Sequence, residues 1–132
     1  MTGRSMTRRS ILALLFVGVP AAVSASLLHL KLSRSIPAAN AVLTSSPTQV
    51  QLWFTQKPEL TVTSIKVKTG TGATAIERTL APLERADGAD TPITAPMGAV
   101  LAAGRHEIVW RTMARDGHVL SGVIPFDVRA AR

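Results

Sequence analysis

The stretch His-Glu-Ile-Val-Trp-Arg at residues 106–111 carries the clearest structural pattern in this chain, because its side chains alternate in character. Successive side chains of a β-strand point to opposite faces, so His106, Ile108 and Trp110 share one face and the charged side chains share the other. Such alternation is typical of a strand that lies between a core and solvent. The stretch therefore predicts a half-buried β-strand.

Further strands are predicted on both sides of it. Residues 50–54 also alternate, residues 61–68 are rich in Val, Ile and Thr, and residues 122–128 form a last strand. Residues 93–98 carry only a weak pattern. Turn and loop residues separate these pieces at Pro37–Asn40, Ser45–Pro47, Gly70–Gly72 and Asp87–Asp90.

The predicted elements define an all-β fold class. No helical period of useful length follows residue 28, and short strands between regularly spaced turns are typical of a sandwich or barrel. Without its first 28 residues the chain has the size of an immunoglobulin-like sandwich, about 100 residues. We therefore expect one domain over residues 29–132, an immunoglobulin-like or cupredoxin-like antiparallel Greek-key β-sandwich.

Residues 1–28 are predicted to be an export signal. Three arginines precede an apolar run at residues 11–23, and small residues follow at 21–26. The run is short for a membrane span, so cleavage is preferred over the alternative of an uncleaved N-terminal anchor. Residues 7–12 are similar to a twin-arginine signal, but a plain basic segment explains the same arginines, and both export routes stay open. We expect the mature domain to be periplasmic or otherwise exported.

The formal net charge of +7 does not indicate a nucleic-acid-binding protein. Arg4, Arg8 and Arg9 lie in the N-terminal segment, which leaves twelve basic and eight acidic residues after residue 28. These basic residues form no run and have no aromatic residues interleaved with them, unlike surfaces that bind nucleic acid. We therefore expect no nucleic-acid partner.

The absence of cysteine narrows the chemistry that the chain can perform. It excludes disulfides, Cys-ligated zinc, a thiol nucleophile and a blue-copper centre, which needs a Cys thiolate. Among the three histidines, His118 follows Asp116 and Gly117, and positions i and i+2 of an extended chain project from the same face. A carboxylate and an imidazole can then reach one metal ion. Asp-Gly is also a common turn dipeptide, so a plain surface turn is the alternative.

Motifs near both ends of the expected domain match one known family pattern. Residues 29–40, His-Leu-Lys-Leu-Ser-Arg-Ser-Ile-Pro-Ala-Ala-Asn, are similar to an opening His-x-x-Leu-x-x-Ser-x-Pro-Ala. Residues 46–59 continue the match, and residues 101–126 add Val-Trp-Arg and Asp-Gly-His-Val-Leu-Ser-Gly, while residues 69–97 lack support. Together these stretches resemble the CopC family of periplasmic copper-binding and copper-resistance proteins.

The resemblance implies one Cu(II) ion per chain. The N-terminal histidine of the mature protein would bind through its imidazole and α-amine, joined by the Asp and His of the Asp-Gly-His segment; here these are His29, Asp116 and His118. Such nitrogen and oxygen ligands suit tetragonal Cu(II). The resemblance also implies a monomeric copper carrier or buffer without enzymatic activity, with an inner-membrane copper transporter of the CopD type as partner.

The methionine content and one histidine depart from the family pattern. Only Met97 and Met113 follow residue 28, so we expect no methionine-rich Cu(I) site. His106 stands where the family usually has tyrosine, and we expect it to be a packing residue at the edge of the sandwich and not a ligand.

The cleavage site decides the chemistry of the new N-terminus. Cleavage after Leu28 makes His29 the first residue and supplies the α-amine, but small residues favour cleavage after Ala25 or Ser26. Cleavage after Ser26 places histidine third, where the amine, two backbone amides and the imidazole form a square-planar nitrogen set without the Asp-Gly-His segment. We expect the family-like site, and the terminal chelate is the alternative.

Two further functions remain open from the sequence. A histidine that binds copper through its own amine can activate oxygen, so a copper-dependent redox enzyme is one alternative. The other is an immunoglobulin-like interaction domain without a metal. Copper titration distinguishes the interaction domain from the two copper-binding functions. Peroxide-driven turnover then distinguishes a copper-binding protein from a copper-dependent enzyme.

Overall fold

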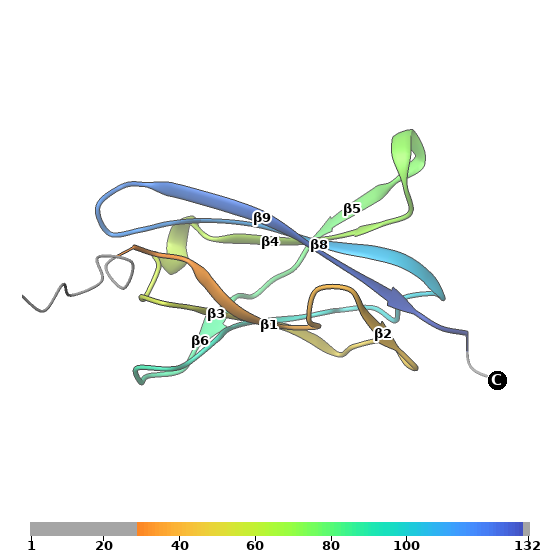
Figure 1. The fold of residues 1–132 in the computed structure, drawn as a ribbon, viewed down its shortest axis with the longest axis horizontal. Coiled ribbons are helices and arrows are strands. Elements are labelled where there is room, and N and C mark those ends of the chain that lie inside the picture. Colours follow the sequence, from red (N-terminus) through yellow and green to blue (C-terminus); the bar gives the residue numbers. More distant parts are fainter. Residues whose placement is uncertain (1–28, 131–132) are drawn as a thin grey trace, which may run out of the picture.

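The structure, a computed structural model, describes residues 29–130 as two β-sheets packed face to face (Figure 1). The first sheet contains, in spatial order, β1 (Leu32–Ile36), β3 (Gln49–Phe54), β7 (Ile93–Pro96) and β6 (Glu84–Arg85). The second contains β2 (Ala41–Leu43), β9 (Val119–Val128), β8 (Gly104–Met113), β4 (Ser64–Thr69) and β5 (Ile76–Thr79). The prediction of an all-β sandwich is confirmed. The expected signal segment, residues 1–28, lies outside the described residues.

Helical structure in residues 29–130 is confined to two 3-10 turns, η2 (Leu60–Val62) and η3 (Gly72–Thr74). The sequence predicts one strand over residues 61–68, but η2 takes up the first of these residues and β4 begins at Ser64. No helix in the described range is long and apolar enough to cross a membrane.

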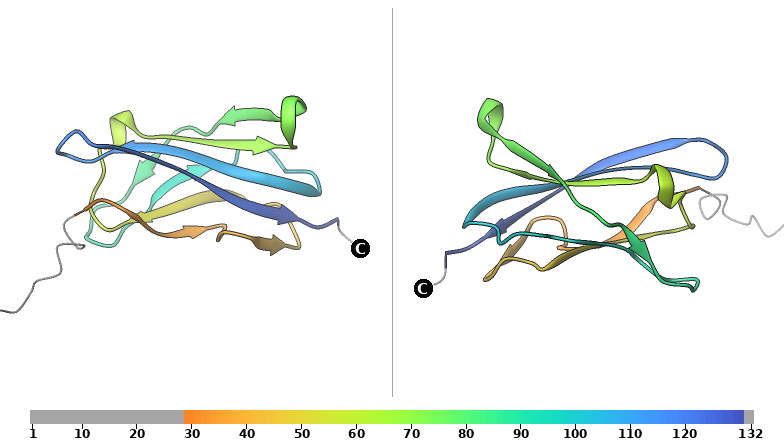
Figure 2. Two further views of the ribbon diagram at one scale, coloured as in Figure 1. Left: turned by 45° about the horizontal axis from the view of Figure 1, so that its top comes forward. Right: turned by 180° about the vertical axis from the view of Figure 1, so that it is seen from behind.

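One strand pair departs from the expected antiparallel order. β2 pairs with β9 in parallel, with Ala41 opposite Phe126 and Leu43 opposite Val128. β1 and β2 follow one another along the same side of the molecule, the first in one sheet and the second in the other (Figure 2). The chain crosses between the sheets without reversing its direction, so β2 meets β9 in the parallel sense. The other pairs among the described strands are antiparallel.

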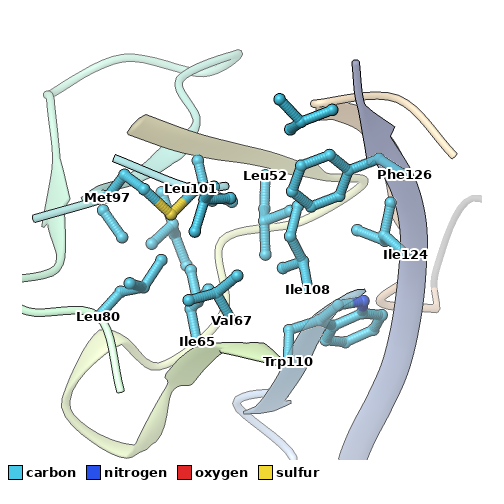
Figure 3. Packing of buried hydrophobic residues seen from close by; sticks show 14 residues of the cluster. Leu52, Ile65, Val67, Leu80, Met97, Leu101, Ile108, Trp110, Ile124 and Phe126 are labelled. Carbon is cyan, nitrogen blue, oxygen red and sulfur yellow. The ribbon is translucent and has the colours of Figure 1, made fainter. Parts of the chain in front are cut away.

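The core lies between the two sheets. β8 contains the predicted strand 106–111 and lies between β9 and β4, with Ile108 and Trp110 buried while Glu107 lies on the outer face in an ion pair. Figure 3 shows both side chains packed in one cluster with Leu52 of β3. Burial of one such side chain stabilises the fold by about 1.5–3 kcal/mol. The alternation in the sequence therefore identified the buried face of β8 correctly.

β5, β6 and β7 fall in the part of the chain where the sequence pattern is weak. Ile93 and Ala95 of β7 are buried, but Pro96 follows them and shortens the alternation. β5 lies at the edge of the second sheet, and its Ile76 is exposed. An edge strand with an exposed apolar residue does not produce the two-residue period from which strands are predicted.

His106 is a packing residue, as predicted, but it lies in the interior and not at an edge. Its side chain is 1% exposed and stacks at a tilt on Phe126, with ring centroids 5.5 Å apart. Nε2 lies 2.8 Å from the carbonyl oxygen of Ala102, which only accepts, so Nε2 carries the proton and donates it. Nδ1 then accepts from the hydroxyl of Thr69 at 3.1 Å. Both ring nitrogens are engaged within the fold.

Three segments that are far apart in the sequence meet at one end of the sandwich. They are the residues before β1, the residues after β3, and the turn between β8 and β9 (Figures 1 and 2). Antiparallel pairing places Phe54, the last residue of β3, opposite Leu32, the first residue of β1. The N–H of Glu59 donates to the carbonyl oxygen of Met113 at 3.0 Å, which ties the segment after β3 to the end of β8.

Candidate metal centre

A pocket of about 440 Å³ opens where these three segments meet. Its walls are formed by His29, Leu30, Lys31, Gln56, Ala114, Asp116, His118, Val119 and Leu120. The three residues predicted as copper ligands, His29, Asp116 and His118, therefore line one pocket. The sequence pattern did not identify the remaining wall residues, because their part in the pocket depends on how the segments pack.

The first wall is the segment that contains His29. Leu30 anchors it in the core, with only 5% of its surface exposed. Thr55, the residue after β3, holds the backbone on both sides of Leu30: its hydroxyl donates to the carbonyl oxygen of His29 at 2.8 Å and accepts from the N–H of Lys31 at 2.9 Å. The N–H of Thr55 donates to the carbonyl oxygen of Lys31 at 2.9 Å.

The second wall is the turn from Ala114 to His118. The N–H of Ala114 donates to the carbonyl oxygen of His118 at 2.8 Å, and the N–H of Gly117 donates to that of Ala114 at 2.9 Å. Gly117 has φ +89°, a conformation that glycine adopts readily and other residues avoid. The sequence left an extended segment and a surface turn open as alternatives here. The structure shows a turn, which still brings the carboxylate and the imidazole together.

Asp116 and His118 form a close pair. Oδ2 of Asp116 lies 2.9 Å from Nδ1 of His118, and the N–H of His118 donates to Oδ1 at 3.1 Å. These hydrogen bonds from the side chain and the backbone of His118 hold the pKa of Asp116 below its ordinary value, so the carboxylate stays ionised. Because the carboxylate accepts, Nδ1 carries the proton. In neutral imidazole the lone pair of Nε2 is then available to a metal ion.

The predicted ligands line the pocket but do not surround a common point. Within residues 29–130, no three His, Cys, Asp or Glu side chains are grouped closely enough to hold a metal ion. The side chains of His118 and Asp116 are 82% and 64% exposed. Exposed side chains of this kind change rotamer on the nanosecond timescale.

These features define a class of protein: a small two-sheet β-sandwich with a histidine and carboxylate pocket between the start of its first strand and its last hairpin turn. The CopC domain model matches residues 32–129, which is most of the chain. The chain belongs to the CopC family.

Known relatives agree with this assignment. The chain is 27% identical over 101 residues to Protein YobA of Escherichia coli K12 and of Shigella flexneri, covering 76% of this chain and 79% of each relative. The crystal structure of CopC from Methylosinus trichosporium OB3b has 27% identity and a TM-score of 0.59, covering 76% of this chain and 94% of that one. PcoC, described as a methionine-rich copper resistance protein from Escherichia coli, has 24% identity and a TM-score of 0.61, covering 76% and 99%. PcoC shares the fold.

Proposed function

We propose that this chain is an exported copper-binding protein that holds one Cu(II) ion and acts in copper homeostasis, resistance or delivery. The observation that carries the proposal is the shared pocket of His29, Asp116 and His118 in a CopC-family sandwich. PcoC, which shares the fold, is a copper resistance protein. The copper ion is the cargo of this protein, and we propose no enzymatic reaction for it.

The donors in the pocket fit the proposed ion. Imidazole nitrogens and a carboxylate oxygen suit Cu(II), which prefers tetragonal nitrogen and oxygen ligands and heads the affinity order of divalent metals. The lowered pKa of Asp116 keeps its carboxylate available to a cation. The chain offers no thiolate for a softer ion, since it has no cysteine. We further propose that the domain acts as a monomer, with an inner-membrane copper transporter of the CopD type as partner.

The first residue of the mature chain determines whether an α-amine is available as the fourth ligand. We expect the exported protein to begin at His29, so that the α-amine joins the imidazole on Cu(II), and to carry one copper ion. The intact mass of the exported protein, measured with and without Cu(II), reports both the first residue and the stoichiometry. A chain that begins at Leu27, with a Cu(II) spectrum unchanged by Asp116→Ala, would refute the pocket site in favour of the terminal chelate.

We expect little specific Cu(I) binding, because the two methionines of the domain lie at opposite ends of the sandwich. Met113 ends β8 beside the pocket, opposite Val119. Met97 is buried, and its N–H donates to the carbonyl oxygen of Thr48 at the start of β3, away from the pocket end. One ion cannot reach both thioethers. Competition against a Cu(I) chelator under reducing conditions checks this, and stoichiometric capture of Cu(I) by the domain would contradict it.

A further inference from the structure

The two walls of the pocket are held in place by different means. Hydrogen bonds within the turn from Ala114 to His118 fix the wall that carries Asp116 and His118. The wall that carries His29 has no such turn, because residues 29–31 precede β1 and lie outside any strand. Chain segments beyond the last regular element fray unless they are tied down. The position of His29 therefore depends on what binds its backbone.

Thr55 supplies that binding. Its side chain and backbone make three hydrogen bonds to residues 29–31, at 2.8, 2.9 and 2.9 Å. One hydroxyl acts as donor to His29 and as acceptor from Lys31, so both bonds depend on a single side-chain oxygen. Four residues further on, the N–H of Glu59 donates to Met113, next to the second wall. The segment 55–59 is thus bonded to the first wall and to the residue that precedes the second wall.

We propose that Thr55 is a positioning residue for the copper site: its hydroxyl holds the backbone of His29 at the wall of the pocket that the Asp-Gly-His turn also lines. The inference rests on the proposed function. A ligand that is held in place before binding loses less freedom when the metal arrives, which favours affinity. Residues that support metal ligands typically raise metal affinity by about 10–100-fold.

The test compares three variants. Thr55→Val keeps the shape of the side chain and removes the hydroxyl, whereas Thr55→Ser keeps the hydroxyl. Thr44→Val is the control: it makes the same change on an exposed residue that follows β2 and does not line the pocket. We expect Thr55→Val to weaken Cu(II) binding about tenfold, at the lower limit for a supporting residue, and to change the nitrogen couplings in the Cu(II) EPR spectrum. The other two variants should retain the affinity and spectrum of the parent protein.

A measurement without copper completes the test. Since the N–H of Lys31 donates to the Thr55 hydroxyl, Thr55→Val should accelerate hydrogen exchange at the Lys31 amide, and Thr55→Ser should not. Unchanged exchange, equal losses in the Val and Ser variants at position 55, or weaker binding with an unchanged spectrum would overturn the proposal. Failure of the parent protein to bind Cu(II) would refute the proposed function instead, while the exchange rate would still report whether Thr55 holds this wall.

Discussion

His118→Ala is expected to weaken Cu(II) binding by more than about 100-fold, since even the loss of a residue that only supports a metal ligand costs about 10–100-fold. The same substitution should leave the folding stability almost unchanged. The His118 side chain is 82% exposed, and its side-chain contact is an exposed pair with Asp116. Competition with a Cu(II) chelator measures the affinity, and thermal unfolding of the copper-free protein measures the stability.

His106→Ala is the matched control, because it makes the same chemical change outside the pocket. His106 is 1% exposed and bonds to Thr69 and Ala102, so its loss opens a cavity and breaks both hydrogen bonds. Large-to-small changes in a core cost about 2–5 kcal/mol of stability. The copper affinity of the folded fraction should not change. Equal losses of affinity in both variants, or none in His118→Ala, would remove the proposed site.

Gly122→Ala is expected to lower the free energy of unfolding by about 1–3 kcal/mol, the usual penalty for an overpacked core. A Cβ atom at Gly122 would lie 2.7 Å from Cε2 and Cζ2 of the Trp110 ring, which is closer than real Cβ atoms come to any neighbour. The ring is almost fully buried, since Trp110 is 6% exposed and packs edge-on against Phe54. For a domain of about 100 residues each kcal/mol lowers Tm by about 4–8 °C. Thermal unfolding checks the prediction.

Two variants establish the cause of this loss. Ser121→Ala changes the exposed neighbour on the outer face of β9 and should have little effect. Trp110→Phe removes the indole atoms nearest Gly122, and it breaks no hydrogen bond among the described residues, where Nε1 of Trp110 has no partner. In a chain that already carries Trp110→Phe, Gly122→Ala should cost less, with a coupling of at least about 0.5 kcal/mol between the two changes. Strictly additive effects would mean that the ring is not what excludes a larger residue.

The sequence by itself determined the fold class and the buried face of the central strand. Alternation along β8 is a local property, since it follows from the geometry of one strand against one core. The sequence also identified the three candidate ligands, because each belongs to a short motif whose residues are close together in the chain. The weakly patterned strands β5, β6 and β7 were not predicted, because β5 and β6 lie at sheet edges and β7 has only four residues, which leaves little periodic signal.

The tertiary structure decided how the parts of the site meet. Only the packing of the two sheets brings His29 into one pocket with the Asp-Gly-His turn, and only the β1 and β3 register places Thr55 against the backbone of His29. The parallel pairing of β2 and the interior position of His106 likewise depend on contacts between distant segments. Such contacts leave no periodic trace in the sequence, because each forms between residues whose spacing along the chain is set by the loops between them.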